Sequence, residues 1–272
     1  MLDWKKHTLS TLSELNLRAS KSMGQNFLVR NSIITKIIKK ANIEENHKII
    51  EIGGGVGILT RSLIKTGAKI TVIEKEKKLA KYLQNTFPEV HVIEGDALKI
   101  DFPGHDKVIA NLPFSISTPI LAKIFHTNSP HAILMLQKEV ADRCVAKPGD
   151  RNYSRLSVLC QLHAIPKKLF DINPDAFFPK PKVISSVVEF FIKPIKLSNS
   201  HEEVELLTRN LFTLRRRTLR AVLRGFLKRK FPTNSIWDEA PNKSKRVFEL
   251  NAIEIDELLT YLKIVNAWPI AV

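Results

Sequence analysis

Four groups of residues in the first half of the chain have types and spacings that suit the binding of a nucleotide-like molecule. A glycine-rich loop over residues 53–57 is followed by Glu74, by Asp96 and then by the tetrapeptide "NLPF" at 111–114. Each group follows a short β-branched run that is typical of a strand. Because open α/β sheets bind ligands at the carboxyl ends of their parallel strands, all four groups are expected along one edge.

The loop and the two acids indicate how an adenosine-containing cofactor could be held. Glycines at 53, 55 and 57 permit positive φ and let the backbone approach a ligand closely. Glu74 could accept hydrogen bonds from both hydroxyls of a ribose, and Asp96 from the exocyclic amine of adenine. Other interpretations stay open: dinucleotide enzymes share the loop and the acid, a ligand-free turn would use the same glycines, and "GDAL" around Asp96 is good capping sequence.

The tetrapeptide separates this set from a dehydrogenase, which needs no such sequence there. The N6 amine of adenine is a poor nucleophile because its lone pair is delocalised into the ring. If the Asn111 side-chain oxygen and the Leu112 carbonyl accept its two N–H groups, the lone pair turns toward an incoming methyl group and the developing positive charge is stabilised. Pro113 would direct the carbonyl inward, and Phe114 would stack on the base. The predicted reaction is methyl transfer to a nucleobase amine without a metal; otherwise "NLPF" is only a strand-ending turn.

Alternating strand-like and helical patterns would position these groups. Strands are expected in 47–53, 68–74, 89–98, 105–113 and at the start of 131–146, and helices in 31–43, 57–67, 75–87, 118–125 and at the end of 131–146. Asn31 or Ser32 is the expected cap of the first helix. The alternation predicts an α/β fold with a Rossmann-like parallel sheet and right-handed crossovers.

The pattern changes after about Pro166. Residues 167–173 and 182–192 are β-type runs around a proline-rich loop, and we expect them to form an antiparallel pair at the edge of the sheet. From about Val204 onward the pattern is helical. The expected organisation is a loose N-terminal arm over 1–20, a catalytic domain over 21–195 and a small all-α RNA-binding domain over 203–272.

Charge is the outlying feature of the composition. The 272 residues are 44% hydrophobic, enough to bury a full core, and 43 Lys and Arg against 27 Asp and Glu leave a net charge of +16. Such an excess predicts a polyanionic partner bound with steep salt dependence, although a basic enzyme without one is the alternative. The expected contact is a basic helix on which four cations recur every four residues: Arg216, Arg220, Arg224 and Lys228. Arg217 beside them and the proline-rich-loop lysines Lys180 and Lys182 are expected to add to it.

The cysteines and the apolar runs indicate in which cellular compartment the protein is expected. Cys144 and Cys160 are too few for a disulfide framework and lack CxxC spacing, so they are expected to be reduced, buried thiols. No apolar run approaches the roughly 18 residues of a membrane span. No secretory signal pattern begins the chain. We therefore expect a cytoplasmic protein.

An ordered set of motifs resembles the rRNA adenine N6-dimethyltransferase family, and within it the small-subunit (16S-type) dimethyladenosine transferases. The set is "GQNFL", "EIGGGVGILT", "VIE", "GDAL", "NLPF", "FFPKPKVISSVV" and "RRRTLR", and the match runs from about Lys21 to Arg220. The resemblance implies S-adenosylmethionine as methyl donor and two adjacent adenosines near the 3′ end of 16S rRNA as acceptors. It also implies the assembling 30S subunit as partner, and a monomer suits an enzyme that docks on a large particle.

By position, the resemblance places cofactor binding on residues in each of the motifs, with Asn111 serving both the cofactor and the target amine: Asn26, Leu28, Gly53, Gly55, Glu74, Asp96 and Asn111. The segment 21–28 would then cover the methionine end of the cofactor, and Phe178 would close on an extruded base from the side opposite Phe114. Alternatively the segment is an ordinary loop, and Phe177 or Phe178 belongs to the core.

Three positions depart from the family pattern: Gly54 replaces a common proline, Phe114 a tyrosine, and Leu214 a frequent glutamine before the arginines. Two rival functions remain. One is a 23S rRNA adenine methyltransferase of the antibiotic-resistance type, which shares most catalytic motifs. The other is a non-catalytic RNA-binding assembly factor that keeps the fold; the intact acids and Asn111 argue against it. A NAD-type dehydrogenase is remote because no acid/base set for hydride transfer is evident.

Overall fold

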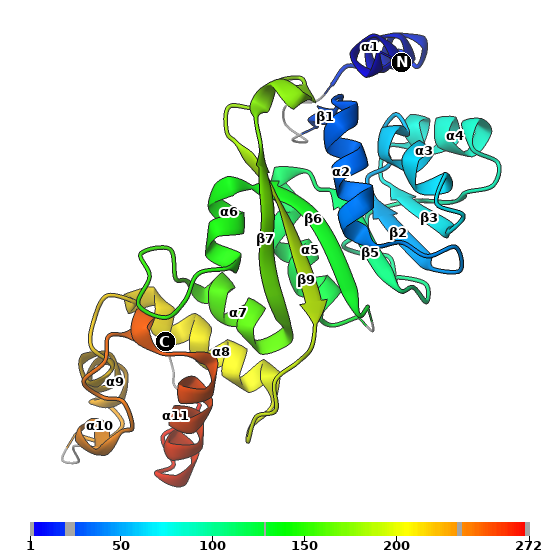
Figure 1. Ribbon diagram of the computed structural model, residues 1–272. Coiled ribbons are helices and arrows are strands. Elements are labelled where there is room, and N and C mark those ends of the chain that lie inside the picture. The colour runs from blue at the N-terminus through cyan, green and yellow to red at the C-terminus, as the bar shows by residue number, and fades with distance from the viewer. Residues whose placement is uncertain (1–2, 20–24, 128, 233–235, 270–272) are drawn as a thin grey trace. The chain divides into compact units, whose positions relative to one another are not determined.

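The computed structural model describes residues 3–19, 25–127, 129–232 and 236–269, and within them the chain forms two compact units (Figure 1). The first unit combines the chain up to Ala141 with Pro166–Ile192. The second combines Asp142–Ile165 with the chain from Lys193 onward. The expected division kept all of 21–195 in one domain, whereas the structure places the segment 142–165 among the C-terminal helices.

The first unit is built on a seven-stranded sheet with the order β4-β3-β2-β5-β6-β9-β7. The pairs β4–β3, β3–β2, β2–β5 and β5–β6 are parallel, and β6–β9 is antiparallel. As expected, β7 and β9 lie next to each other at one edge (Figure 1). The strands are β2 (Lys48–Ile52), β3 (Lys69–Glu74), β4 (His91–Glu94), β5 (Lys107–Asn111), β6 (His131–Gln137), β7 (Ala164–Ile172) and β9 (Ser185–Ile192).

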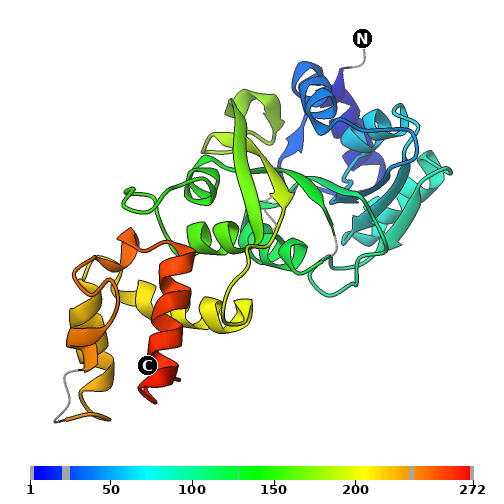
Figure 2. The same ribbon diagram turned by 60° about the horizontal axis from the view of Figure 1, so that its bottom comes forward.

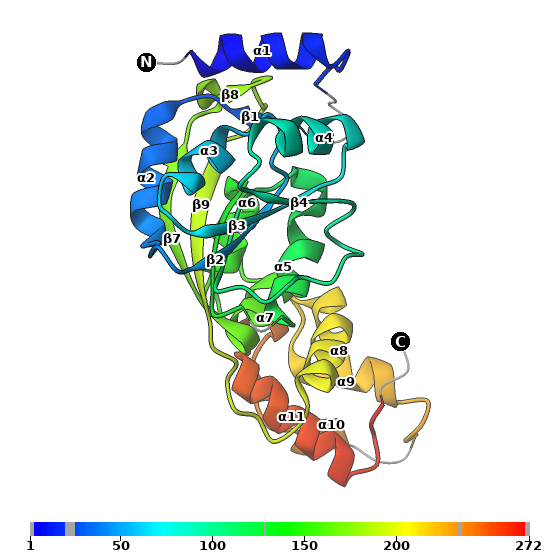
Figure 3. The same ribbon diagram turned by 90° about the vertical axis from the view of Figure 1, so that its right-hand side faces the viewer.

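Helices cover both faces of this sheet, and Figures 1 and 3 show α2 on one face and α5 on the other. The apolar residues of the strands and helices meet in one core that includes Ile37, Leu63, Val72, Leu83 and Ile109. This is the Rossmann-like arrangement predicted from the alternating patterns. The helices are α1 (Trp4–Glu14), α2 (Asn31–Ala41), α3 (Ile58–Ile64), α4 (Lys77–Thr86), α5 (Ser117–Phe125) and α6 (Lys138–Cys144), with short 3-10 turns η1 (Phe114–Ile116) and η2 (Pro174–Ala176).

The expectation of a loose N-terminal arm is wrong for the described residues, because α1 occupies most of them. Asp3 caps this helix by accepting hydrogen bonds from the backbone N–H groups of the next turn. Trp4 and Leu12 are buried, and Thr8 satisfies its hydroxyl on the Trp4 carbonyl at 2.7 Å. Two threonines on the buried face hid the amphipathic pattern from the sequence analysis.

The start of α2 also differs from its prediction. Helix α2 begins at Asn31, so Arg30 occupies the capping position and makes no side-chain cap bond. The Asn31 side chain instead accepts a hydrogen bond from the Trp4 indole at 3.5 Å. The residue chosen as a cap therefore links α2 to α1.

The second unit is helical and has its own core, which includes Val158, Leu207, Val222 and Leu259. Helix α11 packs against α8 and α7, as the yellow-to-red helices of Figure 2 show for α8 and α11. Helix α7 was not predicted from the sequence. It explains why 142–165 belongs here, because its Val158 and Leu162 share a core with Leu207 of α8. The elements are α7 (Arg155–His163), α8 (His201–Leu211), η3 (Phe212–Leu214), α9 (Leu219–Leu227), α10 (Ile236–Glu239), η4 (Val247–Glu249) and α11 (Ala252–Ile264).

Two short strands, β1 (Phe27–Leu28) and β8 (Phe177–Phe178), form a separate antiparallel pair. Nothing in the sequence analysis predicted this pairing, because each strand has only two residues and the partners are far apart in the chain. Among the described residues, no helix is long and apolar enough to cross a membrane.

Candidate active site

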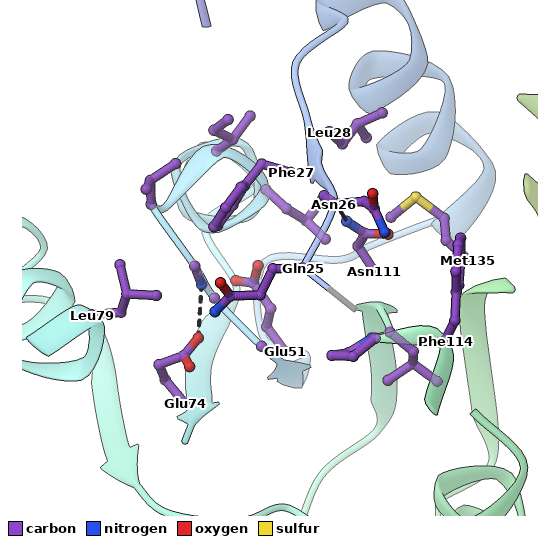
Figure 4. Close-up of a pocket in the computed structure, with 18 residues that line it drawn as sticks. Gln25, Asn26, Phe27, Leu28, Glu51, Glu74, Leu79, Asn111, Phe114 and Met135 are labelled. Atoms are coloured by element: carbon purple, nitrogen blue, oxygen red, sulfur yellow. Dashed lines mark hydrogen bonds between the residues drawn. The ribbon is translucent and has the colours of Figure 1, made fainter. Parts of the chain in front are cut away.

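The register of the parallel strands brings the predicted residues to one edge of the sheet. Ile52 lies opposite both Ile73 and Ala110, so the loop after β2, Glu74 at the end of β3 and Asn111 at the end of β5 are level. Two cavities, of about 100 and 290 Å³, open at this edge and share Gln25, Gly53, Glu74 and Pro113 in their walls. The smaller cavity is also lined by Asn26, Phe27, Leu28, Glu51, Gly55, Asn111, Leu112, Phe114 and Met135 (Figure 4).

The glycine loop adopts the backbone conformation that was predicted for it. Gly53, Gly55 and Gly57 have φ values of 77°, 56° and 79°, a region that side chains rarely adopt. Gly54 is needed for a different reason: a Cβ there would lie 2.6 Å from Val72 Cγ1. Core side chains occupy the space that a proline ring, common in the family at this position, would need.

Glu74 is held at the cavity wall by backbone donors. Its two carboxylate oxygens accept hydrogen bonds from the N–H groups of Gly55 and Glu76, both at 2.9 Å (Figure 4 shows the Gly55 bond). Burial raises the pKa of the Glu74 carboxyl, while these backbone bonds act in the opposite direction. Each oxygen keeps further acceptor capacity, so the group can still bind two hydroxyls of a ribose.

Glu51 lines the same cavity, and sequence reasoning missed it. Burial raises the pKa of its carboxyl from the usual 4.5 to about 8, the Thr60 hydrogen bond lowers it, and the charge of Glu74 raises it. Thr60 Oγ1 donates to Glu51 Oε2 at 2.7 Å. The available signal was an acid among buried apolar positions of the strand "KIIEI". At neutral pH Glu51 is therefore mainly protonated, which avoids a second buried charge beside Glu74.

Asp96 lines the larger cavity with Gly53 and Glu74. Its Oδ1 accepts from the Leu98 backbone N–H at 3.0 Å, so the capping role considered for it is realised. Its Oδ2 pairs with Lys75 Nζ at 2.9 Å, and this hydrogen bond lowers the pKa of the carboxyl. The ionised carboxylate has four acceptor positions, which leaves room for an amine donor as well.

Asn111 projects into the smaller cavity with its orientation fixed. Its Nδ2 donates to the Asn26 backbone carbonyl at 2.8 Å (Figure 4). Only the amide nitrogen can donate to a carbonyl, so the Oδ1 atom is assigned by this bond and remains an acceptor. The predicted acceptor is thus present at the cavity, and the segment 26–28 is tied to it.

The rest of the tetrapeptide forms the neighbouring wall. Leu112 is buried, and the Pro113 carbonyl accepts from Ile116 N at 3.1 Å, which sets the short turn η1. Phe114 begins η1 and lines the cavity together with Met135 (Figure 4). The structure therefore brings the side chains of 111–114 to one place, where an aromatic face lies beside an amide acceptor.

The two aromatic residues of the proline-rich loop divide between core and surface. Phe177 is buried in the core, as one alternative anticipated, whereas Phe178 is half-buried and pairs with Phe27 across β1 and β8. Phe178 is absent from the walls of both cavities, which the described residues define. Lys180 and Lys182 are exposed. Residues 21–24 of the expected cofactor-covering segment lie outside the described residues.

The expected basic helix needs a correction at its start. Helix α9 begins at Leu219, because Thr218 caps it by accepting from Ala221 N at 3.4 Å. Arg216 and Arg217 are exposed but lie before the helix. The cations that recur every four residues on α9 therefore begin at Arg220 and not at Arg216.

Along α9 the surface is concave and basic. Its walls are formed by Thr218, Arg220, Ala221, Arg224, Gly225, Lys228 and Arg229. Arg220 is paired with Asp238. Among the described residues, no ion pair engages Arg224, Lys228 or Arg229.

Known proteins resemble this chain over nearly its whole length. The model of a family described as ribosomal RNA adenine dimethylase matches residues 16–265. A probable ribosomal RNA small subunit methyltransferase A from Thermococcus onnurineus is 38% identical over 96% of this chain and 99% of its own. A dimethyladenosine transferase from Plasmodium falciparum superposes with a TM-score of 0.77 at 28% identity, covering 88% of this chain and 98% of that one. The 23S rRNA methyltransferase ErmE, at 23% identity and a TM-score of 0.66 over 88% of this chain and 100% of its own, shares the fold.

Proposed function

Because this chain belongs to the ribosomal RNA adenine dimethylase family, we propose that it dimethylates the N6 amines of two adjacent adenosines near the 3′ end of small-subunit rRNA. The methyl donor in this proposal is S-adenosylmethionine, which supplies an electrophilic methyl group on sulfur. Four methyl groups are transferred in all, two to each adenosine. The single observation that carries the proposal is Asn111, whose oriented amide lies at the wall of a cavity beside Glu74 and Phe114.

The residues at the sheet edge fit this cofactor. Glu74 would hold the ribose hydroxyls, since its oxygens retain acceptor capacity. Asp96 would accept from the adenine amine in the larger cavity. Gly53 and Gly55 allow close backbone approach, and Asn26 and Leu28 would cover the smaller cavity, which they line.

The target adenine would be held by the tetrapeptide. Asn111 Oδ1 and the Leu112 carbonyl would accept the two N–H groups of the amine, and Phe114 would stack on the ring. This arrangement orients the nitrogen lone pair and stabilises the positive charge that forms on it. The N–C bond would form as the bond from the methyl carbon to the donor sulfur breaks. The methylated nitrogen is then cationic and strongly acidic, and it would release its proton to water, so no dedicated base is required.

The second unit would bind the RNA outside the target base. The exposed cations of α9 and the segment before it are suited to phosphates. Lys180 and Lys182, which are exposed on the first unit, would make phosphate contacts of their own. We propose the assembling 30S subunit in the cytoplasm as the substrate particle and a monomer as the working form.

Mass spectrometry of rRNA after incubation with the protein and cofactor tests the proposal. Separate small and large subunits, purified from cells lacking the modification, would be supplied. Dimethyladenosine only in small-subunit rRNA is the expected result. Modification of the large subunit instead would establish the 23S alternative, and RNA binding without any methylation would establish a non-catalytic assembly factor.

A further inference from the structure

Gly225 lies inside α9 at a position where a helix does not need glycine. Glycine is the poorest helix-forming residue apart from proline. A Cβ added at Gly225 would meet nothing within 4 Å, and its φ lies outside the left-handed region. Neither packing nor backbone conformation within the described residues explains it.

The surroundings of Gly225 suggest a ligand instead. It is exposed on the concave surface of α9, between Arg224 and the pair Lys228 and Arg229. Ala221, one turn earlier, is also small and exposed. The middle of this surface therefore carries no side chain larger than a methyl group. Within the part of the chain that the structure describes, Arg224, Lys228 and Arg229 around it have no ion-pair partner.

We propose that Gly225 is the point of closest approach for the sugar-phosphate backbone of RNA, with Arg224, Lys228 and Arg229 binding the phosphates on either side. The inference rests on the proposed function, because the RNA comes from it. Arg224 and Lys228 are four residues apart, about one helical turn of 5.4 Å, which suits consecutive phosphates of a strand. Arg229 was not among the cations expected from the sequence. Contacts of this kind position RNA without reading its sequence.

Binding of labelled small-subunit rRNA and of an unrelated RNA hairpin to three variants tests this proposal. Gly225→Ala should raise the melting temperature by about 2 °C and still weaken binding of both RNAs. Gly225→Gln, whose longer side chain fills the surface, should weaken binding about tenfold, as for one lost charge-assisted contact. Gly104→Ala is the matched control: its Cβ also meets nothing within 4 Å, but it lies in the first unit, and RNA affinity should not change.

Arg229→Gln tests whether this cation contacts a phosphate. It should make the fall of log affinity with log salt less steep, by about one unit of slope. Lys263→Gln removes the same charge from a lysine that is already paired with Glu203, so it should leave the slope unchanged.

Wild-type affinity in Gly225→Gln would overturn the inference, as would an unchanged slope in Arg229→Gln. Methyl transfer by the wild-type protein is measured separately. Transfer with undiminished RNA binding by Gly225→Gln would overturn only this inference. Failure of transfer with weakened binding in the variant would overturn only the proposed function.

Discussion

Asn111 has two polar ends with different tasks. The nitrogen donates to the Asn26 carbonyl within the protein. In the proposed reaction the oxygen would accept a hydrogen bond from the target amine. Asn111→Ala should lower the rate of methyl transfer by at least about 100-fold, the usual cost of removing one donor or acceptor that stabilises transition-state charge. RNA affinity should stay near that of the wild type, because phosphates supply most of it. Rates and filter binding measure the two effects.

The exposed Asn85 on α4 provides a matched control, since Asn85→Ala should change neither quantity. An equal loss of RNA binding and transfer in Asn111→Ala would contradict a catalytic role for the side chain.

The raised pKa of Glu51 predicts how the stability of the fold depends on pH. Its carboxyl pKa is raised from 4.5 to about 8 by burial, so the folded state retains a proton that the unfolded chain releases above pH 4.5. Stability from this group is therefore complete below about 4.5 and is lost progressively as pH rises toward 8. Glu51→Gln keeps an acceptor for Thr60 and carries no charge. Melting temperatures at pH 5, 7 and 9 should show the variant gaining on the wild type as pH rises.

The control is Glu94→Gln at the exposed end of β4, which should follow the wild-type profile. If the profiles of Glu51→Gln and the wild type run parallel from pH 5 to 9, Glu51 is ionised throughout and the inferred protonation is wrong.

At the scale of elements, the β1–β8 pair joins two segments assigned to different ligands. β1 follows Asn26, which is proposed to cover the cofactor, and β8 precedes the loop with Lys180 and Lys182, which are proposed to contact RNA. Val29 N extends the pairing by donating to the Ala176 carbonyl at 2.8 Å, and Arg30 pairs with Asp175 at 2.6 Å. Ordering one segment by its ligand should therefore help to order the other.

The expected result is that S-adenosylhomocysteine raises RNA affinity, and RNA raises affinity for it by the same factor, about fivefold or more. Val29→Pro removes the backbone donor and should reduce this factor toward one. Val29→Ala shortens the side chain similarly but keeps the N–H, so it should preserve the coupling. Calorimetry with each ligand alone and together measures the factor; identical coupling in all three proteins would rule out this pair as the connection.

The elements also show which inferences a sequence supports. Strands β2, β3 and β5 were predictable because their β-branched runs are local, and the parallel topology then placed Glu74 and Asn111 at one edge. The β1–β8 pair depends on two-residue segments brought together by the whole fold, which no local pattern encodes. The basic stripe was predicted from residue spacing alone. Because Thr218 caps α9, Arg216 lies before the helix and outside the stripe. Glu51 was not predicted as a cavity residue because a buried acid interrupts the apolar pattern of its strand.

At the scale of the whole molecule, the net charge of +16 does not show which of the 43 Lys and Arg side chains are paired with acids. Ion pairs engage Lys75, Arg220, Lys245 and Lys263 with neighbouring acids. A cation already paired releases few counterions from RNA when it binds, because its charge is compensated beforehand. Salt dependence should therefore follow the unpaired cations and not the net charge.

Arg224 and Lys228 test this distinction directly. Replacing both with glutamine should make the fall of log affinity with log salt less steep by about two units of slope, one for each phosphate contact. Replacing Lys245 and Lys263 with glutamine changes the net charge equally but removes cations that already have acid partners. That control should keep the wild-type slope, measured by filter binding between 50 and about 200 mM salt. Equal flattening in both double variants would mean that RNA responds to total charge, and that the surface of α9 has no special part in binding.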